Sequence, residues 1–136
     1  MSGASVEALQ RVPLFSDLSR QELKRIASVF KERRFAAGET VIQQGSGGAA
    51  FFVINSGEAS VSVNGRQQRV LGPGDSFGEL ALIDEGTRTA TVTASTELIC
   101  AGVTFWDFRP LVEESGVIGW KLLQSMVRIY RSDQHE

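Results

Sequence analysis

The chain has 136 residues, of which 42% are hydrophobic and 22% charged, and its 14 basic and 16 acidic side chains give a net charge of −2. This composition is that of one ordinary globular domain, large enough to bury a core without disulfides. The slightly acidic balance offers no basic surface for nucleic acid, and the single cysteine, Cys100, excludes an internal disulfide and favours a buried thiol. No apolar run approaches the ~18 residues of a membrane span and no signal peptide opens the chain, so we expect a soluble, cytoplasmic protein.

Residues 12–30 are predicted to form an N-terminal helical segment. Ser19-Arg20-Gln21-Glu22 has the Ser-x-x-Glu pattern of a capping box, in which the serine and glutamate side chains each accept a backbone N–H of the first turn. Apolar residues then recur at positions 23, 26, 27 and 30, which is helical spacing. A short amphipathic helix is therefore expected after the cap.

Residues 31–103 contain short runs rich in β-branched residues, broken at close intervals by glycine turns. The run from Val61 to Arg66 encloses Asn64-Gly65, which is typical of a hairpin with a two-residue type I′ turn. The cluster Gly45-Ser46-Gly47-Gly48 lacks the lysine and the spacing of a triphosphate-binding loop, so we interpret it as a flexible turn between strands. Such closely spaced strands predict a small antiparallel β-roll, a jelly-roll-like barrel.

Residues 104–131 are predicted to form two C-terminal helices. Thr104 with Asp107 three residues later caps the first, which runs to Glu114 and ends at Ser115-Gly116. The last helix starts at Val117 and carries two apolar stripes, Ile118, Leu122, Met126 and Ile129 on one and Trp120, Leu123, Val127 and Tyr130 on the next. A helix that is apolar over more than half its circumference needs more than one burying surface. Core packing of both stripes and a homodimer seam or partner site remain open alternatives.

These segments together predict an α+β fold. Residues 1–136 are expected to form a single domain, in which a β-roll over 31–103 is flanked by one N-terminal helix and two C-terminal helices.

The stretch 77–92, which reads Phe-Gly-Glu-Leu-Ala-Leu-Ile-Asp-Glu-Gly-Thr-Arg-Thr-Ala-Thr-Val, is the most informative part of the chain. Gly78 lets the backbone approach a ligand closely, and a short helical turn from Glu79 presents unpaired N–H groups that favour an anion. Arg88 adds a planar fork that can bind a phosphate through two parallel hydrogen bonds. Because a carboxylate cannot bind a phosphate, Glu79 is assigned to a pair of neutral hydroxyls, such as those of a ribose. A sugar phosphate site is predicted, with an exposed Glu79–Arg88 ion pair as the alternative.

The segments Gly78-Glu79-Leu80-Ala81-Leu82 and Arg88-Thr89-Ala90-Thr91-Val92 resemble the two halves of the phosphate-binding cassette of cyclic nucleotide-binding domains. Residues 51–57 and 71–75 also resemble elements of that family, so the resemblance covers roughly residues 12–131. It implies that Glu79 binds the ribose 2′-OH and Arg88 the cyclic phosphate, with backbone N–H groups of Leu80, Ala81 and Ala90 assisting. Thr87 departs from the family, where proline is common, and this affects loop stiffness rather than ligand chemistry.

The resemblance also implies how the base is recognised. Thr89 would favour cGMP, because its hydroxyl can accept from the guanine 2-amino group. An ungapped alignment from Arg88 places Asp133 where channel members carry an acidic residue that can accept from guanine, while cAMP remains the alternative ligand. The remaining pocket wall is expected to be apolar, with Val61 and Val70 facing the base and Arg128 or Ile129 covering it.

Catalytic and metal-dependent functions lack the residues they need. The chain has one histidine, His135, whereas a cupin-type metal site needs two or three, and one cysteine cannot hold an iron–sulfur cluster. No nucleophile–base pair can be assembled either. We therefore expect no enzyme, no metal and no cofactor.

The predicted function is a cyclic nucleotide sensor, for cAMP or cGMP, that couples ligand binding to movement of its C-terminal helix. The alternative is a degenerate scaffold of the same fold that contacts proteins without binding nucleotide. Expected partners are the nucleotide and, through the last helix, a second copy or another protein, with no nucleic acid and no membrane segment in this chain.

Overall fold

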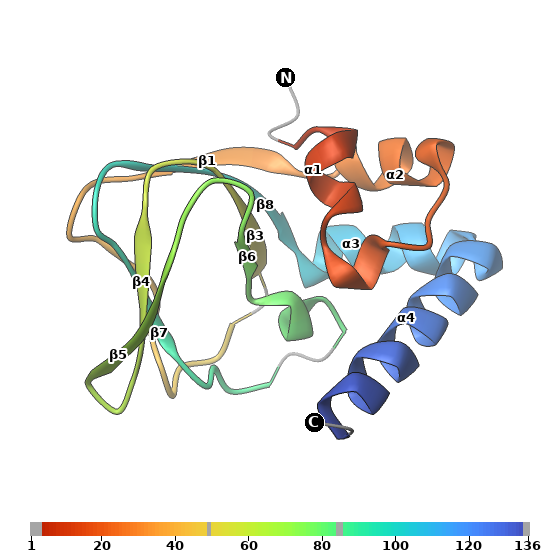
Figure 1. Ribbon diagram of the computed structural model, residues 1–136. Coiled ribbons are helices and arrows are strands. Elements are labelled where there is room, and N and C mark those ends of the chain that lie inside the picture. The colour runs from red at the N-terminus through yellow and green to blue at the C-terminus, as the bar shows by residue number, and fades with distance from the viewer. Residues whose placement is uncertain (1–3, 49, 84–85, 135–136) are drawn as a thin grey trace.

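The computed structural model describes residues 4–48, 50–83 and 86–134, and within them two four-stranded antiparallel sheets face each other (Figure 1). One sheet has the order β1-β8-β3-β6, formed by β1 (Lys31–Phe35), β8 (Leu98–Thr104), β3 (Ala50–Ser56) and β6 (Ser76–Phe77). The other has the order β2-β7-β4-β5, formed by β2 (Thr40–Ile42), β7 (Thr91–Ala94), β4 (Ala59–Val63) and β5 (Arg66–Leu71). The predicted α+β class with an antiparallel β-roll is confirmed.

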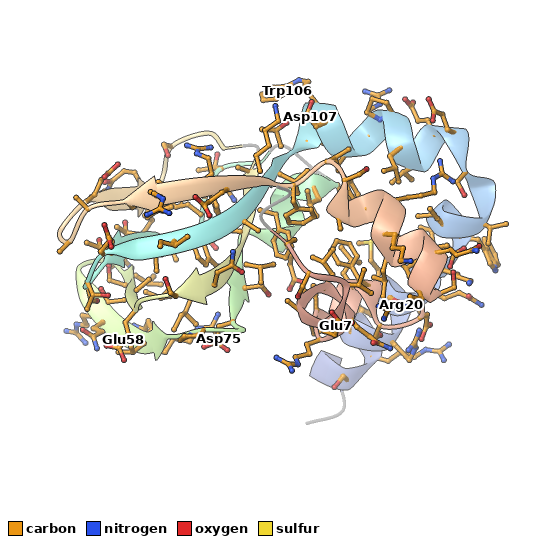
Figure 2. The ribbon with its side chains drawn as sticks, turned by 90° about the horizontal axis from the view of Figure 1, so that it is seen from above. Glu7, Arg20, Glu58, Asp75, Trp106 and Asp107 are labelled. Atoms are coloured by element: carbon orange, nitrogen blue, oxygen red, sulfur yellow. The ribbon has the colours of Figure 1, made fainter. Side chains whose placement is uncertain are left out.

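The helices gather at one end of the roll. They are α1 (Val6–Gln10), η1 (Pro13–Phe15), α2 (Arg20–Ala27), α3 (Phe105–Glu114) and α4 (Gly116–Gln134), and a short 3₁₀ helix, η2 (Glu79–Leu82), lies between the roll and α4. Figure 2, seen from above, shows α2 and α3 continuing the long axis of the sheets.

Side-chain caps explain where two of these helices begin. In α2, the Ser19 hydroxyl accepts the Glu22 N–H and the Glu22 carboxylate accepts the Ser19 N–H, so the predicted capping box is confirmed. The Thr104 hydroxyl accepts the Asp107 N–H at the start of α3, which is also as predicted. Helix α1 was not predicted, because five residues give too short a periodic signal.

The β4–β5 hairpin has the predicted turn and one irregularity. Asn64 and Gly65 have φ angles of 53° and 79°, and two successive positive values define the type I′ turn. Further along the hairpin, Ser62 pairs with Gln67 but Val61 pairs with Arg69, so β5 carries one extra residue at this point. This β-bulge reverses which side chains of β5 face the interior of the roll.

Strand β3 is buried on both of its faces, since its side chains alternate between two hydrophobic cores. Phe51 and Val53 belong to a core shared with the helices, whereas Phe52 and Ile54 belong to the core inside the roll. The helical core includes Phe15, Phe30, Phe108, Ile118 and Leu122, and the roll core includes Phe35, Phe77, Val92, Leu98 and Cys100. Strand β3 therefore forms a wall that is shared by the helical core and the roll core.

The two apolar stripes of α4 have different environments. Ile118 and Leu122 are buried in the helical core and Met126 packs against it. The second stripe is exposed, with Trp120 at 63%, Leu123 at 56%, Val127 at 50% and Tyr130 at 65% of their accessible surface. Core packing of this stripe, one of the two alternatives, is therefore wrong.

Cys100 is buried in the roll core, as predicted, and burial raises the pKa of its thiol to about 11. A thiol that stays protonated at neutral pH is a poor nucleophile and metal ligand.

Among the described residues, no group of histidine, cysteine, aspartate or glutamate side chains could hold a metal ion, and no helix combines the length and apolar character needed to cross a bilayer.

Candidate functional site

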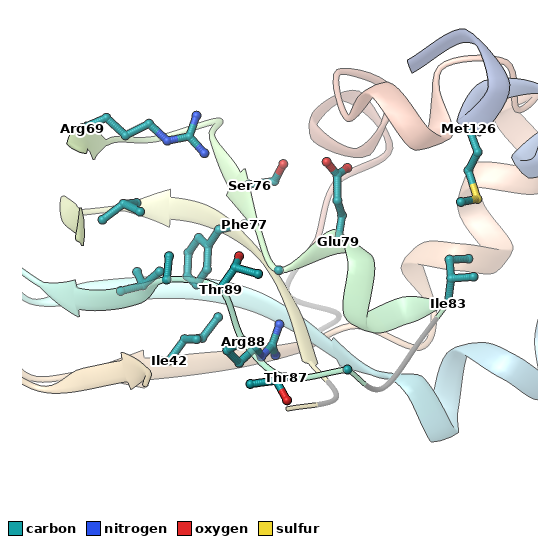
Figure 3. A pocket seen from close by; sticks show the side chains of 15 residues that line it. Ile42, Arg69, Ser76, Phe77, Glu79, Ile83, Thr87, Arg88, Thr89 and Met126 are labelled. Atoms are coloured by element: carbon teal, nitrogen blue, oxygen red, sulfur yellow. The ribbon is translucent and has the colours of Figure 1, made fainter. Parts of the chain in front are cut away.

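A cavity of about 560 Å³ opens between the roll, η2 and α4 (Figure 3). This volume lies within the range of about 300–1,000 Å³ that is usual for small-molecule sites. The cavity is lined by Ile42, Val61, Arg69, Ser76, Phe77, Gly78, Glu79, Ile83, Gly86, Thr87, Arg88, Thr89, Ala90, Val92 and Met126. The lining is mainly apolar and small, with Glu79 and two arginines as its charged members.

Arg88 is held at the start of the segment that leads into β7. Its Nη2 donates to the Ala50 carbonyl oxygen over 2.6 Å, while its Nε is buried without a hydrogen-bond partner in the described part of the chain. Burial also lowers the pKa of the guanidinium from its ordinary value, although an arginine stays charged. A partly buried cation with an unused donor is suited to an anionic ligand.

Glu79 is the first residue of η2 and points into the same cavity (Figure 3). Burial raises the pKa of its carboxyl, and the nearby positive charge of Arg69 partly opposes that rise. Its Oε2 is buried and, among the described residues, has no hydrogen-bond partner. The ion pairs found in the described ranges do not include one between Glu79 and Arg88, so the alternative of a simple surface pair is not what the structure shows.

These two unsatisfied groups define what would fill the cavity. A buried acceptor or donor without a partner is destabilising, so a hydrogen-bond partner from water or a ligand would stabilise each group. A hydroxyl donor would satisfy Glu79 and an anionic oxygen would satisfy Arg88. A sugar phosphate carries both groups on one small molecule.

The structure brings half of the predicted ligand residues together on the cavity wall, namely Val61, Gly78, Glu79, Arg88, Thr89 and Ala90. Leu80 and Ala81 lie in η2, beside the cavity, but their side chains are outside the described part of the structure. Asp133 lies in the last turn of α4 and its side chain is likewise not described.

Three predicted residues do not reach the cavity. Val70 is 52% exposed and pairs with Ser60, because the bulge in β5 turns it to the outer face and places Arg69 opposite Val61 instead. Arg128 points to the other side of α4, where its guanidinium contacts both carboxylate oxygens of Asp17. Ile129 is half-buried on α4 but does not line the cavity.

Sequence analysis missed Arg69 and Met126, the residues that occupy these positions on the cavity wall. The bulge that turns Arg69 inward has no clear sequence signal. Met126 lies on the buried stripe of α4 that the sequence did identify, and only the angle of the helix to the roll decides which member of that stripe meets the cavity.

A profile of the cyclic nucleotide-binding domain family matches residues 32–115, which is more than half of the chain. The chain belongs to the cyclic nucleotide-binding domain family. This is a family of ligand-binding regulatory domains. The matched residues include Glu79 and Arg88, which line one cavity beside η2.

Named relatives place the domain in several kinds of protein. It is 42% identical over 106 residues to the cAMP-dependent protein kinase regulatory subunit of Emericella nidulans, covering 76% of this chain and 26% of the relative. It is 36% identical over 98 residues to a cGMP-dependent protein kinase of Toxoplasma gondii, covering 72% of this chain and 10% of the kinase. The crystal structure of the N-terminal domain of a transcriptional regulator from Streptomyces coelicolor superposes with a TM-score of 0.86 at 28% identity, covering 93% of this chain and 92% of that domain. The chain thus spans about a quarter or less of these two kinase-related proteins.

Burial of Glu79 predicts a pH-dependent penalty on the ligand-free fold. The folded-state pKa of the Glu79 carboxyl is raised, so the fold favours the protonated form of this group. The resulting contribution to the free energy of unfolding is fully present below the ordinary pKa near 4.5 and is lost as the pH rises through the folded-state pKa. Glu79→Gln should therefore raise the melting temperature by a few degrees at neutral pH, and the difference from wild type should vanish near pH 4. Thermal denaturation across this pH range measures it, with Glu97→Gln as an exposed control that should show no such trend. An equal melting temperature for wild type and Glu79→Gln at pH 7 contradicts the assignment.

Proposed function

We propose that residues 1–136 act as one sensor domain that binds a cyclic nucleotide through Arg88 and Glu79. The observation that supports this most directly is the pair of oppositely charged side chains, Arg88 and Glu79, that line one cavity and each carry a buried polar atom without a partner in the described part of the chain. A degenerate scaffold would have no reason to keep both destabilising groups, since an apolar replacement relieves each of them. In this proposal the phosphate binds Arg88 and the ribose 2′-OH donates to Glu79.

Loss of the Arg88 charge should weaken nucleotide binding strongly. Removing one partner of a buried charge pair commonly reduces affinity by a factor of about 30 or more. Calorimetric titration of Arg88→Ala with cAMP and cGMP measures this, with Arg34→Ala, an exposed arginine of β1 paired to Glu32, as the matched control.

The ribose contact is measured in the same titrations. Wild type should bind 2′-deoxy cyclic nucleotides more weakly than the parent compounds, and Glu79→Ala should reduce that difference. Nucleotide affinity that is absent in wild type, or unchanged in a folded Arg88→Ala variant, would overturn the proposed function.

We propose further that the site prefers cGMP. Thr89 lines the cavity and its hydroxyl can accept from the guanine 2-amino group, which adenine lacks. Arg69 on β5 lies opposite Val61 of β4 on the same wall (Figure 3), and an arginine fork matches the two adjacent acceptors O6 and N7 of guanine. Adenine presents an amino donor in place of O6, so the same fork would meet a donor. The relatives include kinases named for each nucleotide, and these two side chains favour the guanine form.

Arg69→Met should therefore weaken cGMP binding by about tenfold, the discrimination expected of one bidentate base contact, and change cAMP binding much less. Thr89→Ala should reduce the same preference. The measurement is the ratio of the two dissociation constants for wild type and each variant. Arg66→Met, at the exposed hairpin end of β5, is the control and should leave the ratio unchanged. A wild-type preference for cAMP that Arg69→Met does not alter would contradict this assignment.

Movement of α4 is the proposed output of ligand binding. Met126 reaches the cavity from α4, so a bound base would contact the helix directly. Two ion pairs fasten α4 to the N-terminal helices: Lys121 Nζ lies 2.8 Å from Glu22 Oε1, and Arg128 contacts Asp17. In this arrangement Arg128 does not line the cavity that it was expected to cover, and we propose that closure of α4 over a ligand breaks its contact with Asp17.

Asp17→Asn should accordingly raise nucleotide affinity. The expected gain is at most about fivefold, because a partly exposed ion pair is worth only about 0–1 kcal/mol. Calorimetry measures the gain, and Glu7→Gln, which breaks the exposed Glu7–Arg20 pair away from α4, serves as the control. Affinity that stays constant in Asp17→Asn would mean that the ligand does not move α4 against this contact.

The exposed stripe of α4 is proposed to bind a second copy of the chain. Trp120, Leu123, Val127 and Tyr130 follow each other at steps of three, four and three residues, which is the a/d spacing that packs against another helix. Side chains of this size, with the two aromatic rings at about 150–250 Å² each, would bury on the order of 1,000 Å² over two chains, which is the lower limit for a specific interface.

The oligomeric state in solution checks this proposal. Wild type should sediment as a dimer at micromolar concentration, and Leu123→Glu should shift it to a monomer, since the charge would be buried in the seam. Ser132→Glu introduces the same charge on an exposed part of α4 outside the seam and should leave the dimer intact. A monomeric wild type over the whole concentration range excludes a second copy as the occupant.

A further inference from the structure

The glycine-rich turn between β2 and β3 encloses the backbone of Arg88. Gly45 N–H donates to the Arg88 carbonyl oxygen over 2.9 Å, and Arg88 N–H donates to the Ser46 carbonyl oxygen over 2.9 Å. Gly47 continues the contact through a bridge to Thr87. The turn over residues 45–48, which the sequence indicated as flexible, is therefore hydrogen-bonded to both the N–H and the carbonyl group of Arg88.

Gly48 lies directly against the Arg88 side chain. A Cβ atom added at Gly48 would overlap Nε of Arg88 and would lie 2.7 Å from Cζ and 2.9 Å from Cδ, closer than side-chain atoms approach each other. The neighbouring Gly47 differs, because a Cβ there would have no other atom within 4 Å. Only one of these two adjacent glycines is thus required by the space around Arg88.

Gly78 also lies close to the guanidinium. A Cβ at Gly78 would lie 3.0 Å from Nη1 of Arg88 and 2.8 Å from the Ala50 carbonyl oxygen, the atom that accepts from Nη2. The guanidinium therefore lies close to two glycines, and one hydrogen bond from Nη2 to the Ala50 carbonyl oxygen holds it.

We infer that Gly48 is a positioning residue for phosphate recognition: it leaves the space that orients the Arg88 guanidinium toward the ligand. The inference rests on the proposed function of Arg88. Bidentate binding of a phosphate depends on the plane and direction of the fork, so a methyl group that displaces the guanidinium by about 1 Å should reduce affinity without removing the charge.

A double-mutant cycle tests this role. Gly48→Ala should weaken binding of both cAMP and cGMP by about tenfold or more, comparable with the loss of one charge-assisted hydrogen bond, whereas Gly47→Ala should stay within about twofold of wild type. In an Arg88→Ala background, Gly48→Ala should cause no further loss, because the group that it displaces is gone. Equal losses for the two glycine variants, or a Gly48→Ala loss that persists in the Arg88→Ala background, would overturn the inference.

A measurement without nucleotide separates this inference from the proposed function. The Nε–H resonance of Arg88 in a ¹⁵N spectrum, identified by its loss in Arg88→Ala, should move in Gly48→Ala and stay in place in Gly47→Ala. If wild type binds neither nucleotide, the proposed function is wrong, and this resonance alone decides whether Gly48 orients Arg88. Should Gly48→Ala fail to fold, the Gly48→Ala, Arg88→Ala double variant decides: recovery of the fold supports the inference and continued unfolding contradicts it.

Discussion

The double-sided burial of β3 is the constraint on which the rest of the molecule depends. Its odd-numbered residues Phe51 and Val53 pack on the helices, and its even-numbered residues Phe52 and Ile54 fill the roll. A strand in this position has no polar face, which explains its continuous apolar sequence. The same strand begins at Ala50, whose carbonyl oxygen holds Arg88. The cavity is thus attached to the best-packed part of the fold, where its geometry is most constrained.

The cavity contains two buried charged groups that destabilise the ligand-free fold. Glu79 and Arg88 have opposite charges and line the same cavity, yet neither neutralises the other, and each has a buried atom without a partner in the described structure. A direct ion pair would relieve both groups and close the site. Because the two side chains stay apart, their unpartnered groups remain available, and under the proposed function a ligand with a hydroxyl and an anionic group would bind both of them.

Local sequence rules predicted what depends on neighbouring residues. The caps of α2 and α3 and the Asn64-Gly65 turn follow from side chains within three residues of each other, and the joined motif from Gly78 to Val92 contains Glu79 and Arg88, which the structure places at one cavity. The errors arose where the outcome depends on partners far along the chain. A single extra residue in β5 exchanged Val70 for Arg69 at the cavity, and the packing angle of α4 brought in Met126 in place of its neighbours. The role of Gly48 was equally invisible, because it depends on a side chain forty positions away.

Met126 and Val127 are adjacent on α4, yet Met126 lines the cavity and Val127 is half exposed on the second apolar stripe. A helix turns by about 100° per residue, so a displacement felt at one position is transmitted to the other without any intervening relay. Under the proposed dimer, thermodynamic linkage makes the two events reciprocal: the factor by which ligand binding changes self-association is the factor by which self-association changes ligand binding. The apparent nucleotide affinity of such a dimerising domain would depend on its own concentration, so the abundance of the protein would set the nucleotide level to which it responds.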